Sequence, residues 1–198
     1  MKQITFKQYR AIDLFMLCLI TVIFETVATL AMNEWFRLQA MAISITLSIT
    51  CIAFMRWSAW GVIPCLVGSA TYCFVSAAEF KQYLIYCIGS LFCLFVLPFL
   101  NKLEKKKIQK SFLRRAIFAT LIYTFVAFGR WLVSLIFSPS ISTFTVFITS
   151  EILSLLFAII ILYICKNLDG VIEDQRSYLL RLDAERRAEQ EAYLNDNF

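Results

Sequence analysis

The sequence predicts an all-α integral membrane protein with six transmembrane helices, both termini in the cytoplasm and a cytoplasmic helical tail. Three observations lead to this class. Of the 198 residues, 60% are hydrophobic and only 17% are charged, whereas a soluble domain has about 25% charged residues. Apolar runs alternate with polar or charged breaks along the chain. Basic residues gather in alternate connections between those runs, which sets an orientation.

Six apolar runs have the length and composition of membrane helices, and the mean hydropathy of the chain is +0.73. The predicted spans are 12–33, 40–55, 59–78, 83–100, 114–137 and 143–165. The second is short for a span, so it must stand nearly upright or be shielded by its neighbours. The first is too long for the apolar part of a signal peptide, and no small-residue cleavage site follows it.

Basic residues predict which side of the membrane each connection faces. The connection 101–115 carries seven basic residues against the single acid Glu104, and the N-terminal arm is basic too. The three connections on the other side hold only Arg37 and Lys81. Cytoplasmic loops carry the excess of lysine and arginine, so both termini are expected in the cytoplasm of a multi-pass protein of the cell membrane.

Two parts of the chain differ in composition. Residues 1–165 form the predicted six-helix transmembrane domain. Residues 166–198 form a charged tail with five basic and eight acidic residues. Leucine and isoleucine recur in it at roughly helical spacing, which predicts a solvated cytoplasmic helix with one mildly apolar face.

Three charged residues within the apolar runs are the main functional lead. Arg130 lies eight residues before the next loop, Glu25 lies eight before the end of its run, and Glu151 lies eight after the start of its run. At 1.5 Å per residue all three are roughly 12 Å below the membrane surface. An arginine cannot be deprotonated there, so it needs a partner.

Two arrangements of these charges are possible. In one, Arg130 bridges Glu25 and Glu151 and joins three helices. In the other, Arg130 pairs with one carboxylate, and the second remains in a polar pocket for a small ligand with a cationic or hydrogen-bond-donating group. Thr21 and Thr29 share the helix face of Glu25, so that face should point into the bundle. Further candidates for lining a substrate site are Asn33, Trp35 and Trp131.

Other chemistries find little support. The sequence has no phosphate-binding loop, no H-E-x-x-H and no G-x-S-x-G motif. It contains no histidine, and its seven cysteines lie inside apolar runs without C-x-x-C spacing. We therefore expect no enzymatic activity, no metal or cofactor and no nucleic-acid binding.

The third apolar run contains IPCLVGSATYCFVSA, in which Pro64 is expected to kink the helix and Gly68 to allow close packing. With its six spans and its polar level near the outer surface, the chain resembles the substrate-binding S components of energy-coupling factor (ECF) transporters. The resemblance implies capture of a vitamin-like or other small micronutrient, with a transmembrane coupling subunit and cytoplasmic ATPases as partners. The first run has Ala28 and Ala31 in place of the family's A-x-x-x-A motif, so no docking residues are assigned.

An alternative remains open at this point. The basic connection 101–115 and the tail 166–198 would also suit a six-helix scaffold or sensor that recruits cytoplasmic partners. Small membrane subunits of bacterial cell-shape machinery have a similar length and topology. In either case membrane lipid is an expected partner.

Overall fold

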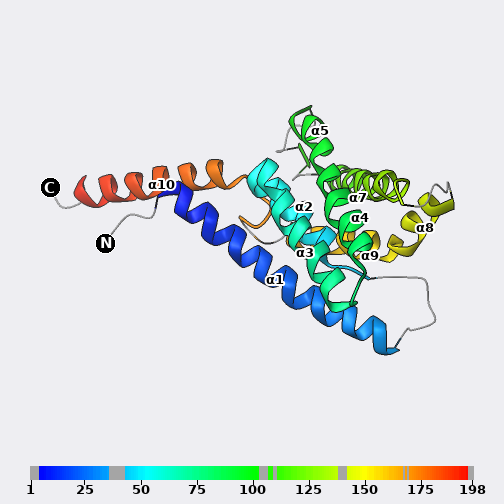
Figure 1. The fold of residues 1–198 in the computed structure, drawn as a ribbon. Helices are drawn as coiled ribbons and strands as arrows, with labels where there is room; N and C mark the ends of the chain where they lie inside the picture. The colour runs from blue at the N-terminus through cyan, green and yellow to red at the C-terminus, as the bar shows by residue number, and fades with distance from the viewer. Residues whose placement is uncertain are drawn as a thin grey trace.

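The computed structural model describes residues 5–35, 43–102, 107–108, 111–137, 142–166, 168 and 170–195, and the regular structure within these ranges is helical (Figure 1). The elements are α1 (Phe6–Trp35), α2 (Thr46–Trp57), the 3₁₀ turn η1 (Ser58–Gly61), α3 (Val62–Val75), α4 (Phe80–Ser90), the 3₁₀ stretch η2 (Leu91–Val96), α5 (Leu97–Lys102), α7 (Phe112–Ser134), α8 (Ser142–Ser150), α9 (Ile152–Cys165) and α10 (Gln175–Asn195).

Five helical segments within the described ranges are long and apolar enough to cross a membrane. They are Phe6–Glu34, Thr46–Val75, Phe80–Leu100, Phe112–Ser134 and Thr143–Cys165. Four of them correspond to one predicted span each. The remaining segment, Thr46–Val75, contains both the second and the third predicted spans. The all-helical class is confirmed, and these segments are consistent with a multi-pass membrane protein.

The segment Thr46–Val75 is a helical hairpin. Ser58 has a φ of 52°, which reverses the chain after α2. A Cβ atom on Gly61 would lie 2.6 Å from the backbone nitrogen of Phe54, so only glycine permits this close return. Pro64 is the third residue of α3, where its missing N–H needs no partner. The chain therefore bends at η1, and the kink expected at Pro64 is wrong.

The helix of the second predicted span begins later than predicted, and residues 40–42 lie outside the described part. Residues 43–45 are not helical, and α2 has only 12 residues, beginning at Thr46. A helix of that length rises roughly 18 Å, against roughly 30 Å for the hydrocarbon core. The start of α2 therefore lies deep among the other helices, close to the middle of α1.

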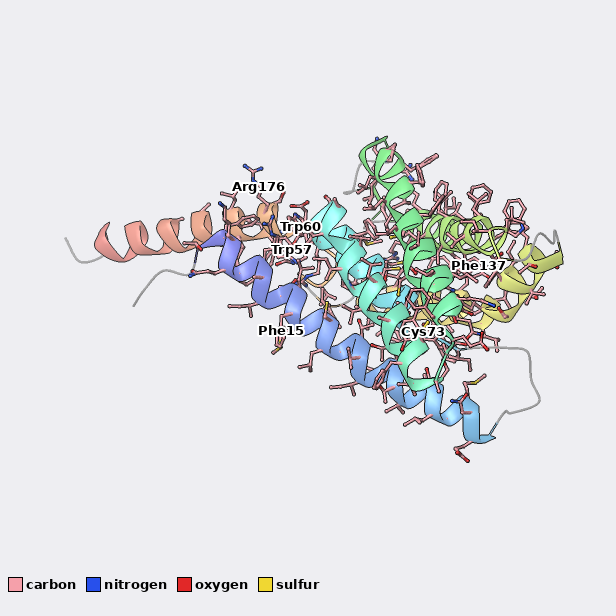
Figure 2. All side chains as sticks on the ribbon, viewed as in Figure 1. Phe15, Trp57, Trp60, Cys73, Phe137 and Arg176 are labelled. Atoms are coloured by element: carbon pink, nitrogen blue, oxygen red, sulfur yellow. The ribbon has the colours of Figure 1, made fainter. Side chains whose placement is uncertain are left out.

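The long helix α1 packs mainly against α3 and exposes its opposite face (Figure 1). Thr21, Glu25 and Thr29 are 1%, 2% and 4% exposed, which confirms the prediction that this face points into the bundle. Phe15 on the other face points away from the protein (Figure 2), as expected of a side chain that meets lipid. The first span also starts earlier than predicted, because the basic arm from Phe6 onward is already helical.

The apolar core lies between α2, α7 and α9, with η2 beside it. Phe54 of α2, Val96 of η2, Phe118 of α7 and Leu162 of α9 meet there, each fully or almost fully buried. The helix predicted in the tail is present as α10, which projects beyond the N-terminal end of α1 (Figure 1). The core thus fixes α7 and α9, the helices on either side of the charged residues described next.

Candidate functional site

Arg130 is placed by a close crossing of α4 and α7. A Cβ atom on Gly89 would lie 2.7 Å from the Cα atom of Arg130, and one on Gly129 would lie 2.6 Å from Cβ of Phe92. Larger residues at either glycine would push the two helices apart. Small residues of this kind allow close backbone contact between membrane helices. The crossing leaves Arg130 8% exposed, with its side chain among the helices.

The guanidinium of Arg130 has partners on only part of its surface. Its Nη1 atom pairs with Oε1 of Glu151, and its Cζ atom lies 4.5 Å from the ring centre of Tyr86. Tyr72 packs against Tyr86 with ring centres 5.0 Å apart. The Nε atom of Arg130 is buried and has no hydrogen-bond partner. Such an orphaned donor is rare in a folded protein and often marks a functional position.

Glu151 occupies a break in the last membrane segment. The sequence predicted a continuous helix over 143–165, but α8 ends at Ser150 and α9 begins at Ile152, with Glu151 between them at φ −107° and ψ 13°. An interrupted helix leaves backbone carbonyls unpaired. One of these, the carbonyl of Ile148, accepts a hydrogen bond from the hydroxyl of Tyr123 on α7. The break turns the Glu151 side chain, 18% exposed, toward Arg130.

Glu25 is held separately, at the start of α2. Its Oε2 atom accepts hydrogen bonds of 2.8 Å from the hydroxyls of Ser44 and Thr46. The carboxylate therefore lies at the N-terminal end of a helix, where the helix dipole favours negative charge. Within the described part of the chain, no cation lies within ion-pair distance of Glu25.

One further hydrogen bond connects the two carboxylates. The backbone N–H of Ser44 donates to the hydroxyl of Ser154, at 2.8 Å. Ser154 lies in the first turn of α9, and its own N–H donates to the carbonyl of Glu151. We call Glu25, Arg130 and Glu151 the central cluster. Among the described residues Arg130 pairs with Glu151 and not with Glu25, so the predicted bridge across both carboxylates is not formed.

The other predicted lining residues are not gathered at one point. Asn33 and Trp35 lie in the last turn of α1, eight and ten residues beyond Glu25, which is roughly 12 and 15 Å along the helix axis. The side chain of Trp35 lies outside the described part. Trp131 follows Arg130, and its ring packs against Phe144 of α8 with its buried Nε1 atom unpartnered. Trp131 is thus adjacent to Arg130 in α7, with its ring packed between Phe128 and Phe144.

An open apolar groove of about 480 Å³ lies between α1, α3 and α4, and Glu25, Arg130 and Glu151 do not line it. Its walls include Thr26, which follows Glu25, and Thr71, which precedes Tyr72. Most of its lining is apolar, from Val22, Ala70, Phe74, Val75 and Tyr83. Ligand sites commonly combine an apolar wall with a few placed polar groups. Among the described residues, no group of three histidine, cysteine or acidic side chains could hold a metal ion.

A second charged group, not anticipated from the sequence, lies where α2 turns into α3. Asp13 of α1 accepts hydrogen bonds from Nε and Nη2 of Arg56 at 2.9 and 2.5 Å, and from Nε1 of Trp57 at 2.5 Å. We call these three residues the α2-turn cluster. Figure 2 shows Trp57 where the turn meets α1 and the beginning of α10. Spacing along the chain gives no sign of it, because Asp13 and Arg56 are far apart in sequence.

The α2-turn cluster also holds the tail. Nη1 of Arg56 donates to the carbonyls of Gly170 and Val171, each at 3.2 Å. Gln175 donates to the Gly170 carbonyl and accepts from the hydroxyl of Tyr9 on α1. The N-terminal half of α1, the α2–α3 turn and the segment before α10 are therefore joined on one side of the molecule.

No protein family, characterised protein or solved structure matches the chain. The fold and the site define its class: an all-helical protein with several helices apolar enough to cross a membrane, in which one buried carboxylate lies at a helix break and another at a helix start. The function is argued from this geometry.

Proposed function

We propose that the chain is a membrane-embedded substrate-capture subunit that binds a small ligand at the central cluster. The observation that carries the proposal is Glu25, which is 2% exposed, accepts hydrogen bonds from Ser44 and Thr46, and has no cation at ion-pair distance in the described part, while Arg130 is already paired with Glu151. A charge within a membrane is expensive, with insertion costs of roughly 2.5–3.5 kcal/mol at a helix centre. An unneutralised carboxylate there calls for a partner.

The charges of the cluster define the ligand chemistry. Two carboxylates and one guanidinium leave one negative charge in excess. A ligand with a cationic or hydrogen-bond-donating group would neutralise Glu25, and an acceptor on the same ligand would satisfy Nε of Arg130. The apolar groove between α1, α3 and α4, whose wall includes Thr26 next to Glu25 in the sequence, has the volume of a small-molecule site. A vitamin-like micronutrient with an amine or amide group fits these requirements.

The helix break at Glu151 and the helix start beside Glu25 support the same function. In transporters, substrate and ion sites often lie where membrane helices are discontinuous, because helix ends present charges and unpaired backbone groups to the ligand. Here Glu25 lies at the start of the short helix α2, and Glu151 lies between α8 and α9. Energy for release would come from separate ATPases through a transmembrane coupling subunit, since the sequence carries no phosphate-binding loop.

We further propose that the chain has six transmembrane segments, with both termini in the cytoplasm. The hairpin of α2 and α3 supplies two of these segments. The short helix α2 is shielded from lipid by α1, α7 and α9. The contacts of Arg56 support a common side for the start of α1 and the tail. The excess of basic residues in 101–115 assigns this side to the cytoplasm.

Purification of the full chain from native membranes in a mild detergent, followed by native mass spectrometry, tests the proposal. We expect a small molecule bound one to one and lost in Glu25→Gln. Glu34→Gln, at the exposed end of the same helix, is the matched control and should retain the molecule. A wild-type protein without any small molecule, isolated with cytoskeletal or signalling partners, would overturn the proposal.

The projection of α10 beyond the bundle favours one second candidate, a scaffold or sensor. Gly170, Val171 and Gln175 bond to Arg56 or Tyr9, so an informative truncation spares them and removes only 183–198. This truncation should abolish partner recruitment if the chain is a scaffold. It should leave ligand binding intact if the chain is a substrate-capture subunit.

A further inference from the structure

A second buried guanidinium lies at the opposite end of α7. Arg115 is 1% exposed, and its Nε, Nη1 and Nη2 atoms all lack a hydrogen-bond partner. A guanidinium has five donors and keeps its proton inside proteins. Burying a charge without a partner is costly, so an arginine in this state is suited to binding an anion. Within the described ranges, no carboxylate forms an ion pair with Arg115.

The surroundings of Arg115 also favour negative charge. α7 begins at Phe112, and the hydroxyl of the preceding Ser111 does not cap the helix. The first N–H groups of a helix and its dipole attract anions. Arg115 is the fourth residue of α7, and side chains in a helix lean toward its N-terminus, which favours a position of the guanidinium near this end. Lys107 lies one turn before Ser111, and the Lys107 carbonyl accepts the N–H of Ser111 at 3.2 Å.

The neighbouring side chains place this helix end at the border of the membrane. Phe112, Leu113 and Ile117 are 49%, 67% and 45% exposed, as expected where a helix meets lipid. Tyr163 of α9 packs edge-on against Phe112 with ring centres 5.7 Å apart, and aromatic residues of this kind favour the interface. The phosphates of membrane lipids lie at this depth.

We propose that Arg115 and the N-terminus of α7 form a binding site for a phosphate-bearing anion. Arginine binds phosphate through two parallel N–H···O bonds, and the helix N–H groups would bind the remaining oxygens. The phosphate can come from an anionic lipid headgroup or from a soluble phosphate. This site is separate from the central cluster and does not depend on the function proposed for it.

The test uses the full chain, delipidated in a maltoside detergent, and measures its unfolding temperature. Phosphatidylglycerol probes the lipid source, inorganic phosphate the soluble source, and a diglucosyl diacylglycerol serves as a lipid without phosphate. At a concentration about 100-fold above Kd, a ligand should raise the unfolding temperature by roughly 5–10 °C. We expect this rise with phosphatidylglycerol or with inorganic phosphate, and none with the glycolipid.

Arg115→Gln should lose most of the rise, whereas Arg114→Gln, which removes the same charge one residue away, should keep it. An equal rise in Arg115→Gln, an equal rise with the glycolipid, or no response to either phosphate-bearing ligand would overturn the proposal. If Arg115→Gln does not fold, two measurements replace it. Arg115→Lys, which keeps the charge but not the paired N–H groups, should show a reduced rise. Native mass spectrometry of the wild type should retain phosphatidylglycerol in preference to the glycolipid, and equal retention would contradict the site.

Discussion

The central cluster and the α2-turn cluster both set an arginine against a carboxylate, but they differ in how completely their polar groups are bonded. In the α2-turn cluster all three nitrogens of Arg56 donate, and Asp13 accepts three hydrogen bonds. In the central cluster Nε of Arg130 has no partner, and Glu25 has no cation in the described part. Complete bonding is the mark of a structural connection. Incomplete bonding in the central cluster is what the proposed ligand site requires.

The largest effect is expected when Arg130 is removed, because Glu151 then becomes an unpaired buried charge. Arg130→Leu should lower the free energy of unfolding by about 3–5 kcal/mol. The double variant Arg130→Leu, Glu151→Leu removes both charges and should recover much of the loss. Denaturant unfolding in detergent measures both. A double variant no more stable than the single one would show that the pair does not act as a unit.

Asp13→Asn tests the other cluster. The amide keeps the shape but loses the charge that holds Arg56, and hydrogen bonds to charged groups contribute about 1.5–3 kcal/mol. We expect a loss of that size in the free energy of unfolding, and faster proteolysis of the tail, since Arg56 also binds the Gly170 carbonyl. Limited proteolysis at matched stability separates the two effects. A tail as resistant as in the wild type would argue against the connection.

Gly89→Ala examines how Arg130 is positioned. The added Cβ atom would meet the backbone of Arg130 at 2.7 Å, so α4 and α7 must separate. Overpacking of this kind costs about 1–3 kcal/mol. Ligand binding should weaken along with stability, because the guanidinium moves with α7. Ile88→Val, on the exposed face of the same turn, is the control and should change little.

Glu25→Gln should have the smallest effect on stability and is the sharpest test of the comparison. The amide oxygen of glutamine can still accept from Ser44 and Thr46, and an unneutralised charge is lost. The free energy of unfolding should change by less than about 1 kcal/mol, in contrast to Asp13→Asn, while ligand binding is lost. A large loss of stability would place Glu25 with the structural group and remove the main support for a ligand site.

The sequence predicted which face of α1 is buried and how deep the charged residues lie. Periodicity identified the inward face of α1 through Thr21, Glu25 and Thr29, and counting residues from the loops placed Arg130 and Glu151 at one depth. It could not tell which carboxylate Arg130 would pair with. That choice depends on the crossing at Gly89 and Gly129, which only the packed helices define.

The sequence also did not predict the helix break at Glu151 or the non-helical residues 43–45 before α2. Glu151 is surrounded by residues that suit a continuous helix, and 40–45 is as apolar as the segment after it. Each break is compensated by a tertiary contact: Ile148 by the hydroxyl of Tyr123, and Ser44 by Ser154. Hydropathy responds to the composition of a segment. It does not detect a hydrogen bond supplied by another helix.

The two clusters together fix the position of α2 along α1. Asp13 and Glu25 are 12 residues apart on α1, which is roughly 18 Å along the helix axis. Their partners Arg56 and Thr46 are 10 residues apart on α2, which is roughly 15 Å. A helix fastened at both ends can neither slide nor change its register. A ligand that drew Glu25 away from Ser44 and Thr46 would release one end and leave the α2-turn cluster as a pivot. Ligand binding at Glu25, deep in the membrane, would then rotate α2 about the α2-turn cluster, where the tail is attached.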